Sequence, residues 1–232
     1  MSVTATPTGP TVIHYPDDDG LPRSDNTWQF NWIVLLHANL DAQFRSDPKV
    51  FVAGNHLIYP VEGDAKTRQA PDVYVVFGRP KQDRGSYKVW EEGDVFPQVV
   101  FEVWSPNNRQ QLMEDKRDFY EKYGAEEYYI VYPEFPSHAE GWKRDGAKLV
   151  RIPEMNGHVS PRLGLRFVLD AGELTVFGPD NRPFRSPAEM AAELDAERQR
   201  AAAEAARVVQ EKERAAKLAA KLRELGVDPD KV

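Results

Sequence analysis

The sequence predicts an α/β protein in which a mixed central sheet is flanked by helices and followed by a long C-terminal helix. The first observation behind this is a strand, helix and strand pattern in residues 96–132, where two apolar runs enclose an amphipathic segment. The second is a set of apolar residues at helical spacing after residue 24. The third is residues 189–225, which lack Gly and Pro and are rich in Ala, Glu, Arg, Lys and Leu.

The strand expected over residues 99–104 directs alternate side chains to opposite faces of the sheet. One face carries Val100, Glu102 and Trp104, and the other carries Val99, Phe101 and Val103. Glu102 is therefore a lone carboxylate within a strand that is apolar on both faces. Burial of such a group is costly unless it has a partner or a metal ion.

The next segment predicts a helix that Asn107 or Asn108 can cap and that Gly124 ends. Its apolar stripe consists of Leu112, Met113, Phe119, Tyr120 and Tyr123. Lys116 falls inside this stripe, whereas the other charged residues fall mostly on the opposite face. For Tyr120, one turn after Lys116, packing is favoured over a role in orienting the lysine.

Lys116 and Glu102 become neighbours if the helix packs back on the sheet. Lys116 then either lays its aliphatic part over the edge of the core, or forms a structural ion pair, or belongs to a functional site. Asp72 favours the last interpretation, because it supplies a second acid at the start of another apolar strand, expected over residues 73–77.

These residues resemble the Uma-two family of "putative restriction endonucleases" (domain of unknown function 820), within the PD-(D/E)XK nuclease superfamily. The resemblance covers residues 60–177. The matching pattern is Pro71-Asp72, Phe101-Glu102-Val103 with Ser105-Pro106, Lys116 with Tyr120, and Gly124 with Glu127-Tyr128-Tyr129. It implies a restriction-endonuclease-like fold and a metal-dependent endonuclease that uses Mg²⁺ (or Mn²⁺) to hydrolyse nucleic acid, with DNA as the expected substrate.

The resemblance also implies the roles of the site residues. Asp72 and Glu102 would be catalytic and would bind the metal, and Lys116 would be the catalytic lysine. Carboxylates that hold a magnesium ion and a nearby ammonium group are the residue types that phosphodiester hydrolysis needs. The superfamily usually places the lysine two residues after the strand acid, where this sequence has Trp104.

A second departure from the pattern is Leu112, at a position where relatives commonly carry an acid. Glu114 and Asp115 are close in sequence but fall on the polar face of the helix. A further metal ligand is expected from a main-chain carbonyl near Val103 or from an acid such as Glu62 or Asp64, and the sequence does not choose between them.

The composition excludes several classes of protein. The 232-residue chain has no cysteine, so disulfides and thiolate zinc sites are excluded, and its net charge of −7 argues against non-specific coating of nucleic acid. No segment approaches the apolar length of a membrane span or a signal peptide, so a cytoplasmic protein is expected. The histidines are scattered without metal-ligand spacing, and Ser105 lacks the glycines of a nucleophile elbow.

We expect four parts in the chain: a flexible arm over 1–23, a restriction-endonuclease-like domain over 24–178, a linker over 179–187 and a C-terminal helix over 188–232. Within the domain, a first helix with Ser24 to Asn26 as caps buries Trp28 and Trp32, and residues 50–59 form a hairpin. The polar loop 78–94, which includes Lys81, Arg84, Lys88 and Trp90, either contacts a substrate backbone or is solvated. Late strands are expected over 147–152, 164–168 and 172–177.

The C-terminal helix is expected to begin after Ser186 and to stop at Gly226. It has a thin coiled-coil pattern, formed by Ala201, Ala205, Val208, Lys212, Ala215, Ala219 and Leu222. Two interpretations remain: an exposed single helix, or a helix that pairs in a homodimer or with a partner protein. The alternative function is therefore a catalytically degenerate nuclease fold that acts as a binding or scaffold protein through this helix.

Overall fold

The computed structural model describes residues 13–18, 26–106 and 108–225 and divides the chain into two compact units. The first unit ends at Ser186 and the second begins at Pro187. The expected caps Ser24 and Asn107 and the expected stop Gly226 lie outside the described residues. In the described residues, no helix has the length and apolar character needed to cross a membrane.

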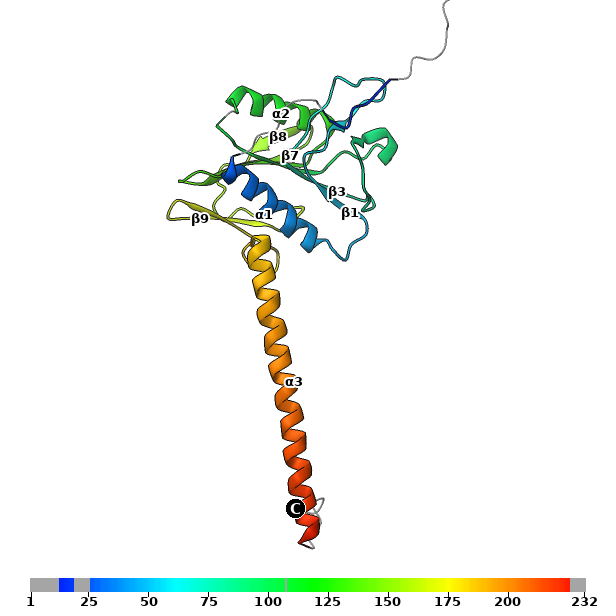
Figure 1. Ribbon diagram of the computed structural model, residues 1–232. Helices are drawn as coiled ribbons and strands as arrows, with labels where there is room; N and C mark the ends of the chain where they lie inside the picture. Colours follow the sequence, from blue (N-terminus) through cyan, green and yellow to red (C-terminus); the bar gives the residue numbers. More distant parts are fainter. Residues whose placement is uncertain (1–12, 19–25, 107, 226–232) are drawn as a thin grey trace, which may run out of the picture. The chain divides into compact units, whose positions relative to one another are not determined.

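A six-stranded mixed sheet forms the centre of the first unit (Figure 1), with strand order β1-β3-β5-β6-β7-β8. β5 and β6 are parallel and are connected by helix α2, while every other neighbouring pair is antiparallel. This confirms the predicted fold class. The strands are β1 (Val50–Ala53), β3 (Val73–Phe77), β5 (Val99–Val103), β6 (Glu127–Tyr132), β7 (His138–Asp145) and β8 (Lys148–Arg151).

Two small sheets accompany the central one. β9 (Arg166–Asp170) and β10 (Glu173–Phe177) form an antiparallel pair, and β2 (Ile58–Tyr59) pairs in parallel with β4 (Tyr87–Lys88). The expected hairpin over residues 50–59 is therefore wrong. β1 pairs with β3 instead, because its short apolar run finds a longer apolar partner there.

Helix α1 (Thr27–Gln43) packs on one face of the sheet through Ile33, Leu36 and Leu40. Asn26 caps it, since its side chain accepts a hydrogen bond from the backbone of Gln29. Trp32 packs partly against this core, but Trp28 is 60% exposed. The expected burial of Trp28 is wrong, because the buried stripe runs through Gln29 and Ile33 rather than through both tryptophans.

Helix α2 (Gln110–Tyr123) packs on the opposite face through Met113 and Tyr120. It ends as expected at Gly124, which has φ 107° and whose N–H donates to the carbonyls of the last turn. Its N-cap is Arg109 rather than Asn108. Leu112 is 42% exposed, so it does not belong to the buried stripe.

The 78–94 loop is more ordered than a solvated excursion. It contains β4 and the 3₁₀ helix η1 (Val89–Glu92). Arg84 forms a two-pronged ion pair with Glu92, and its guanidinium lies 4.1 Å from the centre of the Phe51 ring. Arg84 is therefore held in the core and does not serve as a substrate contact.

Glu127, at the start of β6, is a buried carboxylate with a structural role. It accepts hydrogen bonds from the hydroxyls of Tyr129 and Ser160 and from the backbone N–H of Arg162. Ser160 and Arg162 thereby attach the segment after β8 to the start of β6, an interior strand of the central sheet. Glu127 and Tyr129, two residues of the pattern shared with the Uma-two family, therefore have a structural role.

The second unit consists of helix α3 (Pro187–Glu224), and none of its residues is buried. Its apolar side chains are exposed: Leu194 is 47%, Val208 42%, Val209 55% and Leu218 54% accessible. An alanine-rich composition without Gly, and without Pro after the first helical residue Pro187, accounts for a helix of this length.

Gly54 allows the chain after β1 to pass close to the backbone of Asp72. A Cβ atom added at Gly54 would collide with the Asp72 carbonyl oxygen, and the N–H of Asn55 donates to the Pro71 carbonyl at 2.9 Å. Only a residue without a side chain fits this approach. Gly54 thereby fixes the backbone that carries the Asp72 carboxylate.

We predict that Gly54→Ala lowers the free energy of unfolding by about 1–3 kcal/mol, because backbone has to move to remove the collision. Gly85→Ala is the matched control, since the atoms nearest to its added Cβ belong to the side-chain carboxylate of Asp17, which can rotate away. Urea denaturation of both variants measures the difference. Equal stability of the two variants would contradict the proposed close approach.

Candidate active site

The strand register brings Asp72 and Glu102 together. β3 and β5 are antiparallel with Val73 opposite Phe101, so an extension of this register by one residue sets Asp72 opposite Glu102. The backbone N–H of Val103 donates to Asp72 Oδ2 at 2.6 Å. The Asp72 side chain is thereby held beside the strand segment that carries Glu102.

Glu102 is fully buried, and both of its carboxylate oxygens accept hydrogen bonds from α2. Lys116 Nζ donates to Oε2 at 2.7 Å, and the Tyr120 hydroxyl donates to Oε1 at 2.8 Å. Lys116 and Tyr120 are four residues apart and so lie on one helix face. The helix that covers this face of the sheet therefore supplies both partners of the buried acid.

Lys116 is held in its charged form by the two acids. Burial alone would lower the pKa of Lys116, but the attraction of Glu102 and then of Asp72 outweighs it, so the pKa is raised above 10.5. Its side chain is 15% exposed, compared with 1% for Glu102. Lys116 therefore keeps a small exposed fraction, while the carboxylate that it pairs with is inaccessible.

Tyr120 stays protonated beside Glu102. Its complete burial, and next the negative charge of Glu102, raise the pKa of Tyr120 well above its ordinary value. Sequence reasoning favoured packing for this residue. Its packing is real, but its hydroxyl also holds one Glu102 oxygen. The i, i+4 spacing from Lys116 was the signal for this role, since it sets both side chains on the helix face that covers Glu102.

The three predicted site residues, Asp72, Glu102 and Lys116, thus converge on one face of the sheet, and we call them the acid–lysine cluster. The other expected acids do not join it. Asp64 accepts hydrogen bonds from the backbone of its own loop, at Lys66 and Thr67. Within residues 13–18, 26–106 and 108–225, no group of three or more His, Asp or Glu side chains could hold a metal ion.

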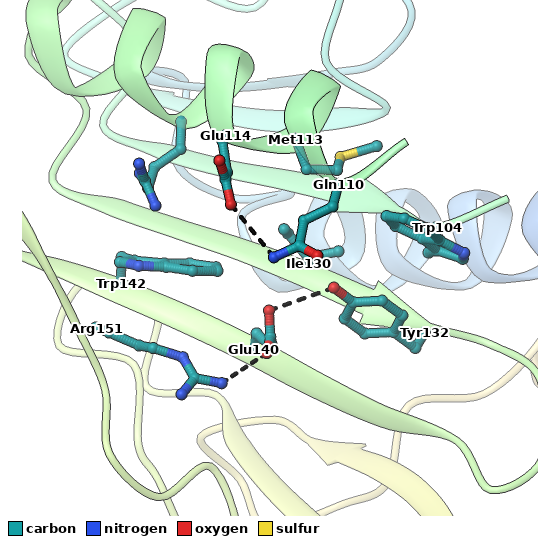
Figure 2. A pocket seen from close by; sticks show the side chains of 10 residues that line it. Trp104, Gln110, Met113, Glu114, Ile130, Tyr132, Glu140, Trp142 and Arg151 are labelled. Carbon is teal, nitrogen blue, oxygen red and sulfur yellow. Dashed lines mark hydrogen bonds and ion pairs between the residues drawn. The ribbon is translucent and has the colours of Figure 1, made fainter. Parts of the chain in front are cut away.

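A pocket of about 650 Å³ lies on the same face of the sheet as the acid–lysine cluster (Figure 2). Strand residues supply one side of it and α2 residues the other. The sequence set Trp104 on the strand face of Glu102, at the usual place of the lysine, but did not indicate a pocket there. The β7 residues were missed because that strand was not predicted. We call this the aromatic pocket; it is lined by Trp104, Gln110, Met113, Glu114, Arg117, Ile130, Tyr132, Glu140, Trp142 and Arg151.

Comparison with known families agrees with the fold and the motifs. The sequence profile of Uma2, described as "Putative restriction endonuclease", matches residues 22–137, a segment that contains the acid–lysine cluster. The chain belongs to the Uma2 family. The Uma2 match ends before β7, so Glu140, Trp142 and Arg151 of the aromatic pocket lie outside the matched segment.

Among solved structures, this Uma2 chain is similar to a protein from Anabaena variabilis ATCC 29413, described as "a putative nuclease belonging to DUF820". The TM-score is 0.44 and the sequence identity 12%, over 60% of this chain and 74% of that one. No curated protein matches the sequence.

We predict that Lys116→Met lowers the free energy of unfolding at pH 7 by about 3–5 kcal/mol, because it leaves Glu102 buried without its cation. Since the folded-state pKa of Lys116 is raised above 10.5, this contribution is fully present below pH 10.5 and is lost as the pH rises through the folded-state value. Denaturation of wild type and variant from pH 7 to 11.5 should therefore show a difference that narrows only at the alkaline end.

A double-mutant cycle with Glu102→Gln provides the control. The double variant should recover part of the loss, because no unpaired charge remains buried. Additive losses would show that the Lys116–Glu102 contact contributes no coupling.

Proposed function

We propose that this protein is a metal-dependent endonuclease that hydrolyses phosphodiester bonds in DNA, with Asp72, Glu102 and Lys116 as its catalytic residues. One observation carries the proposal. Two carboxylates and one ammonium, from the start of β3, β5 and α2, meet at a single place: Asp72 is held by the backbone of Val103, and Lys116, whose side chain is 15% exposed, donates to the buried Glu102.

Lys116 would stabilise the transition state of phosphodiester hydrolysis. Negative charge grows on the phosphate oxygens during hydrolysis, and a fixed ammonium beside them lowers the energy of that state. Lys116 is suited to this role because its pKa is raised and its position is set by Glu102. Tyr120 acts as a positioning residue, since its hydroxyl holds Glu102 rather than the substrate.

The donor set fits a hard divalent cation. Magnesium is commonly bound by one or two carboxylates, with water and substrate phosphate completing its shell. An ionised carboxylate has about four lone-pair sites, so the two hydrogen bonds to Glu102 leave acceptor capacity. Asp72 and Glu102 would hold the ion, and when bound it would lower the pKa of a coordinated water and polarise the phosphate.

We predict that the full-length protein cleaves plasmid DNA only when Mg²⁺ or Mn²⁺ is added. Asp72→Asn, Glu102→Gln and Lys116→Met should each lower the cleavage rate about 100-fold or more, because each removes charge that acts on the reacting phosphate. Gel analysis of time courses, with matched preparations of all proteins, measures the rates.

Lys122→Met and Asp145→Asn are the matched controls for charge removal, since both side chains belong to exposed residues away from the acid–lysine cluster. They should cleave at the wild-type rate. Cleavage that persists unchanged in all three site variants would assign the activity to a contaminant. A wild type that is inert on DNA and RNA with both metals would overturn the catalytic role.

We also propose that α3 pairs with the α3 helix of a second copy. Positions seven residues apart along it form an apolar line, Leu194, Ala201, Val208, Ala215 and Leu222, and Leu194 and Val208 are exposed within the chain. Alanine buries little area, so the pairing is expected to be weak and dependent on concentration.

We predict that full-length protein shows a mass in light scattering that rises with concentration. Val208→Asp should abolish this rise, since it introduces a charge in the apolar line. Val209→Asp, one position off the line and also exposed to solvent, should leave it unchanged. A monomer at all concentrations, or equal effects of the two substitutions, would contradict pairing through this face.

A further inference from the structure

The aromatic pocket adjoins the acid–lysine cluster directly. Trp104 follows Glu102 by two residues on one strand face, a separation of about 7 Å. Ile130 lies in register with Glu102 on the neighbouring strand, and Met113 precedes Lys116 by three residues on α2. If one part of a ligand occupied the aromatic pocket, a neighbouring part of the same ligand would therefore lie at the acid–lysine cluster.

Aromatic rings make up much of the sheet side of the pocket. Trp104 and Tyr132 are stacked with ring centres 5.3 Å apart, and both are only partly buried. The ring of Tyr132 also stacks on the ring of His138, with ring centres 4.3 Å apart and an angle of 4° between the ring planes. Trp142 lies deeper and packs on Tyr128. Tyr132, stacked between Trp104 and His138, holds the Trp104 ring in place, so that a flat ligand would stack on the face of Trp104 turned away from Tyr132.

Polar groups surround these rings with balanced charge. Figure 2 shows Arg151 and Tyr132 directed at Glu140, and Gln110 directed at Glu114. With Arg117, the pocket has two carboxylates and two guanidinium groups. An anionic phosphate would meet both carboxylates there, whereas a neutral ligand with donors and acceptors on its edge would find partners of both kinds.

We propose that the aromatic pocket binds one unpaired nucleobase of the strand whose phosphate lies at the acid–lysine cluster. A nucleobase is flat, neutral and edged with hydrogen-bond donors and acceptors. Glutamine amides, glutamate carboxylates and arginine guanidinium groups are the side chains that read such edges. This inference rests on the proposed function and adds its substrate class: single-stranded or locally unpaired nucleic acid.

Duplex DNA does not present a base in this way. Its bases are stacked on one another, so a base must leave the stack before its face can meet a protein ring, at a cost of a few kcal/mol. Stacking on aromatic side chains also supplies affinity without a basic surface, which suits a chain with a net charge of −7. Binding should accordingly depend less on salt than binding through many phosphate contacts.

The test measures binding apart from cleavage. Full-length protein in EDTA is titrated into a fluorescent 15-nucleotide single strand, into its duplex and into an abasic strand of equal length. The single strand should bind at least tenfold more tightly than either of the others. Trp104→Ala should weaken single-strand binding about 5- to 150-fold, the range expected for loss of one base–aromatic stack.

Two further variants keep the result interpretable. Trp104→Phe retains a ring and should keep most of the affinity, which separates stacking from a folding defect. Trp28→Ala is the matched control, because Trp28 is exposed on α1, the helix on the other face of the sheet, and its loss should change nothing.

Equal affinity for the single strand, duplex and abasic strand would overturn the base pocket, as would equal effects of Trp104→Ala and Trp28→Ala. The proposed function is tested separately by adding Mg²⁺. Single-strand binding that depends on Trp104, without any cleavage, would support the base pocket and reject the nuclease activity. Cleavage by a protein whose single-strand binding does not depend on Trp104 would support the nuclease activity and reject the base pocket.

Discussion

The buried carboxylate of Glu102 is the constraint on which this part of the structure depends. It lies in the middle of the sheet, with no exposed surface, where an unpaired charge would be costly. Lys116 and Tyr120 satisfy it from one helix face. The position of α2 along β5 is thereby determined by polar contacts as well as by packing, because a shift of one turn would separate both donors from the acid.

A second buried carboxylate shows what distinguishes this arrangement. Glu127 is as inaccessible as Glu102, but the donors at its oxygens are two hydroxyls and a backbone N–H. That set holds a loop to the sheet. Glu102 instead pairs with the ammonium of Lys116, whose side chain is 15% exposed, and it has a second acid, Asp72, across the strand pair. Burial alone therefore does not mark a site; the partners and their access to solvent do.

Local patterns singled out Asp72, Glu102 and Lys116, whereas their grouping into one site was implied by the family resemblance, because the pairing of β3 with β5 joins residues far apart in sequence. Alternation fixes which strand residues share a face, helical spacing exposes a lysine in an apolar stripe, and a Pro-Asp pair marks a strand start. The partner of β1 was not predictable in the same way, since strand pairing joins residues far apart in sequence. β7 was missed because most of its residues are polar, among them Lys143 and Arg144. Its sequence therefore lacks the run of apolar residues that marks a buried strand.

Trp28 and Tyr120 show a related limit. Both are aromatic residues at helical spacing, yet one is exposed and the other donates to a buried acid. A rotation of a helix about its own axis by tens of degrees changes which side chains face the sheet. The sequence does not fix this rotation when aromatic residues lie on both sides of the apolar stripe of the helix.

The acid–lysine cluster and the aromatic pocket are built in part from different strands, and this affects how the sequences of relatives can diverge. The acid–lysine cluster is built from β5, α2 and the start of β3, all within the segment that matches the family. One side of the adjoining pocket comes from β7 and β8, which follow that segment. Substitutions in this later hairpin can reshape the pocket while the carboxylates and the lysine keep their positions. Close relatives could thus differ in the shape of this pocket and still share the acid–lysine cluster.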